Sequence, residues 1–251
     1  MNLSLIIPAY NCAQIIRGTL DAFFSYLPAH CPSFEVIVVD DGSSDGTFNE
    51  LSSMRDSHLR LLRYPKNRGK FGAIKAGMLA AGGLCRIFTD ADLPYAVSAI
   101  PYTVHLVNDL QYHLAVGDRT LPESKDHTDR NCLRRAFSAS CRTAVRLLVA
   151  GEMFDTQCGL KAIRGDVAEA IFPLIRDDGF AGDIELLYIA LKYNLAIRRV
   201  PVRLERSSQT TVRLGMDSLR ILKRLLLLRS AWRRGEYYSA RLVQISRQNY
   251  G

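Results

Sequence analysis

The sequence predicts an α/β fold in which helices flank a mostly parallel, doubly wound sheet. Short apolar segments alternate with amphipathic segments through about the first 110 residues, and polar or turn-forming residues follow several of the apolar segments. Four such strand–helix units favour parallel strands joined by right-handed crossovers. The chain of 251 residues is long enough for a sizeable core. Its 48% hydrophobic and 23% charged residues are ordinary for a soluble globular protein.

The first part of the chain has the most regular pattern. We expect strands at residues 3–8, 34–39, 59–63 and 84–89, with helices at 13–26, at 70–81 and from about Thr47, where Asp45 or Thr47 provides the cap. Pro94 is expected to end the fourth strand and to open the next helix.

Beyond residue 112 the alternation becomes irregular. We expect strands at residues 113–116, 158–163 and 196–200, and helices at 130–149, 166–172, 182–191 and 215–232. No internal repeat or low-complexity linker interrupts the chain. We divide it into a body, residues 1–210, and a basic amphipathic helical stretch, residues 211–251, which we call the basic segment.

The net positive charge of the chain comes from its C-terminal end. Residues 198–251 hold 13 of the 33 Lys and Arg residues but only 3 of the 25 Asp and Glu residues, so the rest of the chain is nearly neutral. A nucleic-acid-binding tail is disfavoured, because its aromatic side chains for stacking are limited to Trp232, Tyr237 and Tyr238.

Cysteine usage and hydropathy bear on the compartment. The six cysteines are scattered without a C-x-x-C pair, which argues against a zinc site or a disulfide framework and suggests reduced, cytosolic thiols. The first residues are typical of a strand rather than a signal peptide. No stretch reaches the roughly 18 uncharged apolar residues that cross a bilayer. We expect a cytoplasmic protein.

Asp90 and Asp92 follow the apolar segment 84–89, at the carboxyl end of an expected buried strand. Two carboxylates one residue apart repel each other, and a divalent cation removes that penalty. Mg²⁺ or Mn²⁺ held by one or two carboxylates usually completes its shell with substrate phosphates. The alternative is a pair of solvated loop acids, which is common for an isolated D-x-D.

Two other polar loops are expected on the same edge, because ligands bind beyond the carboxyl ends of parallel strands. A carboxylate of Asp40 or Asp41 is suited to accept the imide N–H of a uracil or thymine ring, with Tyr10 stacked on that ring. Neither G-x-G-x-x-G nor a Walker A sequence is present, so a bound nucleotide would need a metal for its diphosphate. Residues 66–70 form either a cationic diphosphate clamp or a solvated basic loop.

Six sequence blocks resemble family 2 glycosyltransferases of the GT-A type. The superfamily motifs are LIIPAYN (residues 5–11), VVDDGS (38–43) and TDAD (89–92). The blocks KNRGK (66–70), DTQCGLK (155–161) and DIELLYIA (183–190) resemble the dolichyl-phosphate glucosyltransferase branch, with the dolichyl-phosphate mannose synthases as cousins. The likeness runs from about residue 3 to 205. It implies a GT-A, Rossmann-like fold.

The resemblance also implies residue roles. The nucleotide-sugar site would comprise Pro8, Tyr10, Asn11, Asp40, Asp41, Lys70, Asp90 and Ala91, with Asp90 and Asp92 binding Mg²⁺ or Mn²⁺. Arg119 matches a phosphate-binding arginine, and Lys161 a basic residue of a phosphate-binding strand. Three positions depart from the family pattern: Cys12 replaces a usual glutamate, Asp118 a serine, and Leu93–Pro94 the usual Gln or Gly.

The expected reaction moves a hexose, with glucose favoured, from UDP-glucose to a polyprenyl or dolichyl phosphate with inversion. An anionic acceptor oxygen needs no strong base, so the task is to bring two anionic groups together. Arg119, Lys161, Arg130 and Arg134 are the candidate cations. A hydroxyl acceptor of a glycan or glycolipid would instead need a base, for which Asp183 is the candidate. Asp183 is equally suited to cap its helix.

The expected helix 215–232 combines a wide apolar face with basic flanks. It either packs on the body or a second copy, or lies on an anionic membrane surface on the cytoplasmic face. Each Lys or Arg near such a surface contributes about 1 kcal/mol. A separate integral-membrane partner is the further alternative.

Overall fold

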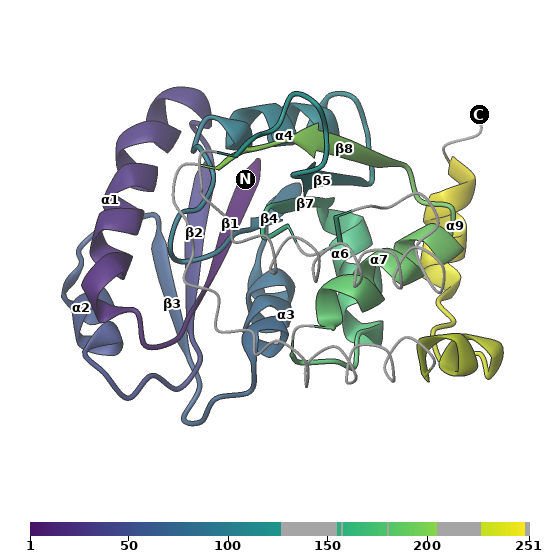
Figure 1. The fold of residues 1–251 in the computed structure, drawn as a ribbon, viewed down its shortest axis with the longest axis horizontal. Coiled ribbons are helices and arrows are strands. Elements are labelled where there is room, and N and C mark those ends of the chain that lie inside the picture. The colour runs from purple at the N-terminus through teal and green to yellow at the C-terminus, as the bar shows by residue number, and fades with distance from the viewer. Residues whose placement is uncertain (127–154, 157, 180, 205–226, 249–251) are drawn as a thin grey trace.

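A computed structural model describes residues 1–126, 155–156, 158–179, 181–204 and 227–248 (Figure 1). The expected helix 130–149, with Arg130 and Arg134, and most of the expected helix 215–232 therefore lie outside the described residues. Within the described part, no helix is both long and apolar enough to span a bilayer.

The described elements follow the expected alternation. The strands are β1 (Leu3–Ala9), β2 (Phe34–Asp40), β3 (Leu59–Arg63), β4 (Cys85–Phe88), β5 (Leu114–Asp118), β6 (Lys125–Asp126), β7 (Lys161–Arg164), β8 (Ile197–Pro201) and β9 (Arg203–Leu204). The helices are α1 (Ala13–His30), α2 (Thr47–Ser53), α3 (Lys70–Ala80), α4 (Ala99–Asn108), α6 (Gly165–Ile171), α7 (Gly182–Lys192) and α9 (Ala240–Arg247), with a 3₁₀ turn at Phe172–Leu174. Residues 227–233 are also helical.

Seven strands form one sheet in the order β3-β2-β1-β4-β7-β5-β8. All neighbouring pairs are parallel except those of β7, which runs antiparallel to both β4 and β5. The mostly parallel sheet expected from the sequence is confirmed. Because β7 is reversed, its first residue, Lys161, lies beside Phe88 at the carboxyl end of β4.

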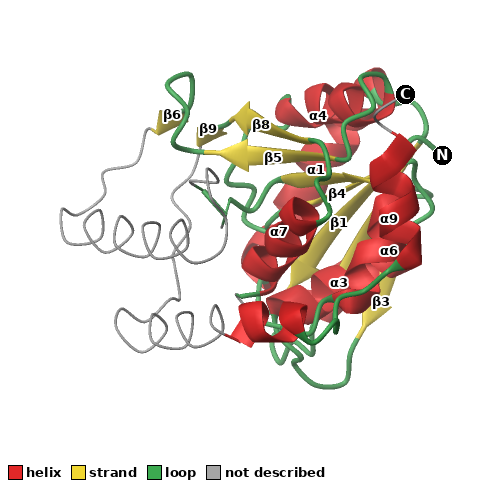
Figure 2. Ribbon diagram, turned by 90° about the vertical axis from the view of Figure 1, so that its right-hand side faces the viewer, coloured by secondary structure: helices red, strands yellow, loops and turns green. Residues whose placement is uncertain are grey.

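Helices cover both faces of the sheet, as alternating side chains of β1 illustrate. Leu5 and Ile7 pack in the core under α1 and α4, whereas Ile6 points to the opposite core with α3, α6 and α7. Figure 2 shows α3, α6 and α9 side by side along that second layer. The inner strands β1, β2, β4 and β5 are buried on both faces, which explains their near-continuous apolar sequences, whereas the edge strands β3 and β8 are more exposed.

Two expectations about local structure need correction. Pro94 does not open a helix: α4 begins at Ala99, because Tyr95 first forms a β-bridge with Leu204. The expected strand 158–163 begins only at Lys161. Helix α9 was not expected; it is a short amphipathic helix that buries Leu242 and Ile245.

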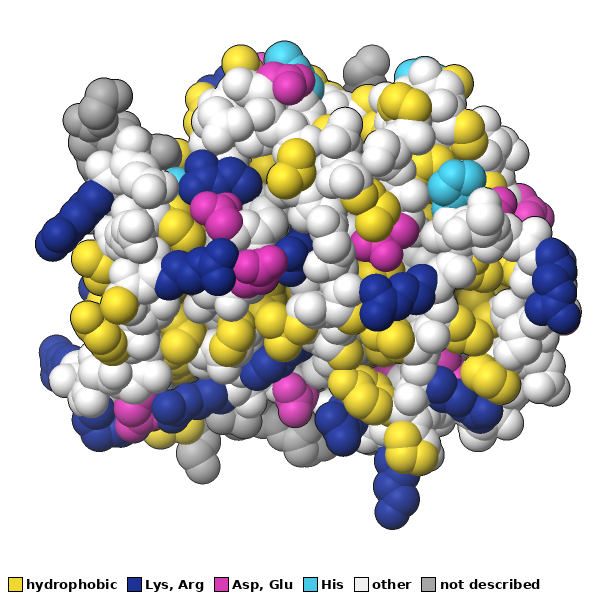
Figure 3. Space-filling view, turned by 180° about the vertical axis from the view of Figure 1, so that it is seen from behind, with side chains coloured by type: hydrophobic (Ala, Val, Ile, Leu, Met, Phe, Trp, Pro, Cys, Tyr) yellow, Lys and Arg dark blue, Asp and Glu magenta, His cyan; other side chains and the backbone are white. Residues whose placement is uncertain are grey.

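Surface charge agrees with the near-neutral body. On the face seen in Figure 3, Lys and Arg side chains are spread among Asp, Glu and hydrophobic side chains rather than gathered in one field.

Candidate active site

The loops after β1 and β2 are joined to each other by hydrogen bonds. The backbone N–H of Asn11 donates to Ser43 Oγ (3.0 Å), and the Asn11 Oδ1 accepts the N–H of Ser44 (2.9 Å). Asn11 has φ +49°, a left-handed conformation that asparagine tolerates better than most residues. Tyr10, just after β1, is 52% exposed and so accessible to a stacking ring, while Pro8 lies within the strand.

Asp45 holds the starts of two helices. Its Oδ2 accepts the N–H of Ala13 at the start of α1 (3.1 Å), and its Oδ1 accepts the N–H of Thr47 at the start of α2 (2.9 Å). The N-cap position of α2 is Gly46, so neither Asp45 nor Thr47 occupies it; Asp45 holds the helix start from the preceding turn. These bonds lower the pKa of Asp45 and outweigh the opposing effect of its slight burial.

Asp41 holds the loop that leads into α3. Its Oδ1 accepts the N–H of Arg68 (2.8 Å) and its Oδ2 accepts the N–H of Gly69 (2.9 Å). Gly42 is required here, because it has φ +70° and a Cβ would lie 2.7 Å from the nitrogen of Asn67. The neighbouring Asp40 is fully buried, 3.2 Å from Arg63 Nε. Both carboxylates therefore build the loops of the predicted nucleoside site.

Residues 66–70 fit the two alternatives in part, because some of their side chains are solvated and one faces the site. The side chains of Lys66 and Arg68 are exposed, and the Arg68 guanidinium lies 4.2 Å from the centre of the Tyr64 ring. Lys70 turns inward instead, and its Nζ lies 2.5 Å from Asp90 Oδ1. Burial disfavours the charged ammonium, but the carboxylates of Asp90, Asp183 and Asp92 outweigh it and raise the pKa of Lys70.

The D-x-D segment is wedged between β4 and the residues that precede β7. A Cβ on Gly159 would lie 2.1 Å from Asp90 Oδ2, so only glycine allows this approach. The N–H of Gly159 donates to the hydroxyl of Tyr95 (3.1 Å). On the other side, the carbonyl of Ala91 accepts a hydrogen bond from Thr19 Oγ1 of α1 (2.7 Å). The segment is thereby held both by the residues before β7 and by α1.

The donor set of Asp90 and Asp92 fits a hard divalent cation, because both offer carboxylate oxygens. Across the part of the chain that the structure describes, no three His, Cys, Asp or Glu side chains gather into a metal-binding group. Phosphate oxygens of a substrate and water would therefore supply the other ligands. The Lys70 ammonium at Asp90 shows that this position attracts positive charge.

Arg119, directly after β5, is held by a carboxylate that the sequence did not single out. Its Nε and Nη2 donate to Asp155 Oδ2 and Oδ1, both at 2.7 Å, and its backbone N–H donates to Oδ2 at 3.0 Å. The bonds to Asp155 outweigh burial and raise the pKa of Arg119, and the same pair lowers the pKa of Asp155. The pair uses two of the five N–H groups of the guanidinium, which leaves both N–H groups of Nη1 and one of Nη2 for a phosphate. The one sequence signal for Asp155 was its place in the block 155–161.

Asp118, where the family pattern has serine, serves the turn after β5. Its Oδ1 accepts the N–H and hydroxyl of Thr120 (2.8 and 2.6 Å), and its Oδ2 accepts Arg199 Nε of β8 (2.7 Å). This departure therefore strengthens the edge that carries Arg119.

Lys161 and Asp183 form a buried ion pair. Lys161 is 0% exposed, and its Nζ donates to Asp183 Oδ1 and to the carbonyl of Cys158, each at 2.6 Å. Asp183 lies in the first turn of α7, whose N-cap, Ala181, has no capping side chain. Asp183 accordingly pairs with Lys161 instead of capping the helix. Its charge also interacts favourably with the helix dipole.

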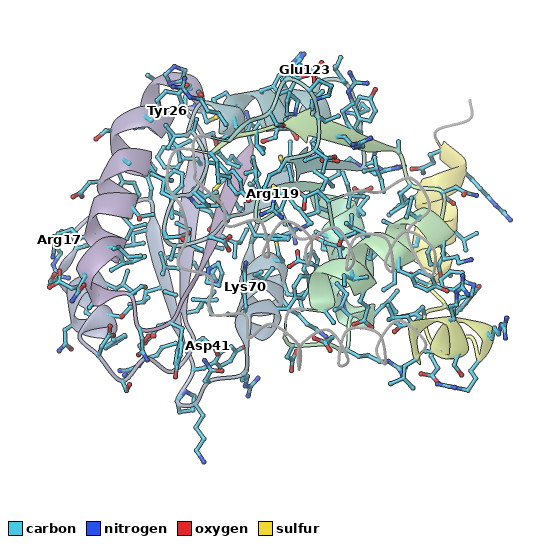
Figure 4. All side chains as sticks on the ribbon, in the orientation of Figure 1. Arg17, Tyr26, Asp41, Lys70, Arg119 and Glu123 are labelled. Carbon is cyan, nitrogen blue, oxygen red and sulfur yellow. The ribbon has the colours of Figure 1, made fainter. Side chains whose placement is uncertain are left out.

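The structure brings most of the predicted residues to one edge of the sheet. Figure 4 shows Asp41, Lys70 and Arg119 in succession across it, from the end of β2 through the start of α3 to the end of β5. The Lys70–Asp90 and Lys161–Asp183 pairs belong to the same edge, and Asp183 contributes to the electrostatic environment of Lys70.

Comparison with known proteins assigns this chain to a family. The family described as Glycosyl transferase family 2 matches residues 4–172. The human dolichyl-phosphate beta-glucosyltransferase is 31% identical over 254 residues, covering 92% of this chain and 77% of that protein. The Drosophila melanogaster protein of the same name is 32% identical over 257 residues, covering 93% and 77%.

Solved structures agree in fold. Glucosyl-3-phosphoglycerate synthase from Mycobacterium tuberculosis in complex with UDP has a TM-score of 0.68 at 22% identity, covering 90% of this chain and 79% of that chain. The same enzyme in complex with Mn²⁺, UDP-glucose and phosphoglyceric acid has a TM-score of 0.66 at 21% identity, with the same coverage. The chain belongs to glycosyl transferase family 2, resembles its dolichyl-phosphate glucosyltransferases, and is a glycosyltransferase.

Proposed function

We propose that this protein transfers glucose from UDP-glucose to the phosphate of a polyprenyl lipid such as dolichyl phosphate. The choice of glucose and of a lipid phosphate rests on the relatives, which are named dolichyl-phosphate beta-glucosyltransferases. In the proposed step an acceptor phosphate oxygen attacks the anomeric carbon while the bond to the UDP oxygen breaks. UDP leaves with the electron pair, and an α-linked donor yields a β-linked product.

The Lys161–Asp183 pair is the structural observation that supports a phosphate acceptor. A general base must present an oxygen that can take a proton, and one of the two Asp183 oxygens, Oδ1, is already engaged by the buried ammonium. A phosphate acceptor is anionic before it reacts and needs no proton removed. The site would therefore work by placing and neutralising phosphate groups.

The donor would bind across the loops after β1, β2 and β4. Tyr10 is accessible for stacking, the Asp40–Asp41 segment shapes the base pocket, and Lys70 faces the diphosphate position. When bound, Mg²⁺ or Mn²⁺ would be held by Asp90 and Asp92 and would neutralise charge on the diphosphate. Arg119, held by Asp155, would offer its Nη1 to the acceptor phosphate from the other side.

A transfer assay with a panel of donors and acceptors tests the proposal. Labelled UDP-glucose, UDP-galactose and GDP-mannose are each offered with dolichyl phosphate or undecaprenyl phosphate, with and without EDTA. We expect an acid-labile glucolipid from UDP-glucose, lost with chelator and with Asp92→Ala. Binding of UDP-glucose without any labelled lipid would contradict the phosphate-acceptor proposal.

The role of Asp183 needs a three-variant test, because Asp183→Asn alone leaves the Lys161 ammonium buried without its partner. Asp183→Asn, Lys161→Met and the double variant are compared by their transfer rates. A structural ion pair predicts that the double variant recovers activity relative to Asp183→Asn. If Asp183 is a base for a hydroxyl acceptor, Asp183→Asn and the double variant are both inactive, whereas Lys161→Met keeps activity.

We also propose that the basic segment 211–251 holds the enzyme at an anionic membrane surface. The chain carries most of its excess positive charge there, and an anionic membrane surface attracts such charge. Flotation with vesicles of neutral lipid, and with vesicles containing anionic lipid, at low and high salt tests this. Binding only to anionic vesicles, weakened by salt, is expected. Equal binding to neutral vesicles without salt dependence would contradict it, and dimers that form without vesicles would favour packing on a second copy.

A further inference from the structure

The last described part of the chain, residues 227–248, is packed into the body; we call it the C-terminal segment. It shares a core with Phe71 of α3 through a set of buried side chains: Leu228, Ala231, Tyr237, Leu242 and Ile245. Trp232 lies against three tyrosine rings at centroid distances of 5.5–6.4 Å, those of Tyr188, Tyr193 and Tyr237. This packing brings Tyr237 to α7, the helix that begins with Asp183.

Tyr237 reaches a buried carboxylate on α7. Its hydroxyl donates to Glu185 Oε1 (2.6 Å), and Glu185 is only 2% exposed. The other oxygen, Oε2, accepts the backbone N–H groups of Arg176 (3.2 Å) and Asp177 (2.9 Å). Glu185 therefore connects the C-terminal segment to residues 175–179, which we call the 175–179 loop. The Arg176 side chain adds a second connection, because it pairs with Glu236 of the same segment.

The 175–179 loop in turn holds the first turn of α3. The carbonyl of Asp178 accepts the N–H groups of Phe71 (2.8 Å) and Gly72 (3.0 Å). These N–H groups lie at the start of the helix, where intrahelical partners are lacking. Gly69 allows the contact, because a Cβ there would lie 2.5 Å from the Asp178 oxygen. Lys70, which pairs with Asp90, is the first residue of α3.

We propose that Tyr237 and Glu185 are positioning residues: through the 175–179 loop they set the place of the α3 start, and hence of Lys70, in the donor site. The inference rests on the proposed function only in that Lys70 serves the nucleotide-sugar diphosphate. Neither residue contacts the reacting atoms. The C-terminal segment is thus part of what makes the donor site.

The test compares two matched variants, Tyr237→Phe in the C-terminal segment and Tyr193→Phe directly after α7. Each loses one phenolic oxygen that ties the C-terminal segment to α7. The Tyr193 hydroxyl donates to the carbonyl of Tyr237 (2.8 Å) and accepts the N–H of Ser239 (2.7 Å). Among the described residues it is bonded neither to the 175–179 loop nor to Glu185. Tyr193→Phe therefore reports on anchoring of the segment alone.

Amide hydrogen exchange gives a readout that needs no substrate. In Tyr237→Phe we expect about tenfold faster exchange at Arg176, Asp177, Phe71 and Gly72, the factor that corresponds to losing one hydrogen bond to a charged group. In Tyr193→Phe these four amides should keep the wild-type exchange rate. Equal acceleration in both variants, or none in Tyr237→Phe, overturns the proposal.

Kinetics give the second readout. Tyr237→Phe should raise KM for UDP-glucose about five- to tenfold with kcat within about twofold, since one hydrogen bond of modest strength is removed from a positioning contact. Glu185→Gln, which keeps an oxygen for the backbone N–H groups, should retain more donor binding than Glu185→Ala. A fall in kcat with unchanged KM contradicts the proposal. If UDP-glucose proves not to be a donor, the proposed function fails while the exchange result still decides the positioning.

Discussion

The donor side and the acceptor side of the site are held together in different ways. On the donor side, carboxylates and amides of the loops accept hydrogen bonds from backbone N–H groups, as Asp41 does from Arg68 and Gly69. On the acceptor side, opposite charges pair across long stretches of sequence: Arg119 with Asp155, and Lys161 with Asp183. The donor side is thus defined by loop shape and the acceptor side by placed charge.

The difference matters for what each side recognises. A nucleoside ring requires a rigid, shaped surface, and carboxylate-to-backbone bonds such as those of Asp41 fix the loops that form it. A phosphate requires cations that stay in place without substrate, and Asp155 holds Arg119 in this way. The fully buried Lys161 is instead occupied by Asp183, and a buried charge that loses its partner is costly. Substitutions on the donor side should therefore change mainly the local loop structure, whereas substitutions on the acceptor side should lower the stability of the whole protein.

The largest effect is expected at the Lys161–Asp183 pair. Asp183→Asn or Lys161→Met alone should lower the free energy of unfolding by about 3–5 kcal/mol, because each leaves one buried charge unpaired. The double variant should be destabilised by clearly less than the sum of the two. Denaturant unfolding of all four proteins measures this, and strict additivity would mean that the two groups do not interact.

The next largest effect is expected for Asp155→Asn, which should lower the free energy of unfolding by about 2–3 kcal/mol because the charge-assisted bonds to Arg119 weaken. Asp166→Asn is the matched control, because Arg164 makes the same two-pronged contact with Asp166 (2.7 and 2.9 Å) but at a more exposed position. The control should cost under about 1 kcal/mol. Similar losses in both variants would remove the distinction between site and surface pairs.

The free energy of unfolding, measured as a function of pH, distinguishes the contribution of these ion pairs from that of a histidine at the opposite end of the sheet. His113 is buried just before β5, and its Nδ1 accepts the N–H of Ala196 (2.8 Å). Burial, together with the charge of Arg164, lowers the pKa of His113 from 6.5 to about 4. Between these pH values the unfolded chain binds a proton that the folded chain does not, so the stability contributed by His113 is complete above pH 6.5 and lost as pH falls toward 4.

The loss should be on the order of 2–3 kcal/mol. His113→Asn keeps an acceptor for the Ala196 N–H and removes the titration, so its stability should change little over this range. Asp155, whose pKa is lowered from 3.8, should add its own loss only below about pH 4. If His113→Asn shows the wild-type acid loss between pH 6.5 and 4, another group is responsible.

The smallest effect on stability is expected on the donor side. Asp41→Asn should lower the free energy of unfolding by about 1 kcal/mol, because one of its two acceptor oxygens is replaced by a donor. Exchange of the Arg68 and Gly69 amides should accelerate, and UDP-glucose binding should weaken. Asp56→Asn is the control, since Asp56 accepts the N–H of His58 (2.8 Å) in a loop away from the site. Equal loss of donor binding in both variants would contradict a local role for Asp41.

The same contrast explains what could be predicted from sequence. The parallel strands and the loops after β1, β2 and β4 were predictable, because short apolar runs and adjacent turn residues encode them locally. The partners of the charges were not: Asp155 lies 36 residues from Arg119, and Asp183 lies 22 residues from Lys161. The same holds for Tyr237 and Glu185, which are 52 residues apart. The order of strands around the reversed β7, which brings such residues together, has no local sequence signal.

The central claim, glucosyl transfer to a lipid phosphate, is tested most directly by identifying the bond that forms. UDP-glucose labelled with ¹³C at the anomeric carbon is incubated with the enzyme and dolichyl phosphate, and the lipid product is followed by ³¹P and ¹³C NMR. We predict that the phosphomonoester signal gives way to a phosphodiester whose phosphorus is coupled to a β-configured anomeric carbon. Release of UDP with the phosphomonoester unchanged would contradict the claim.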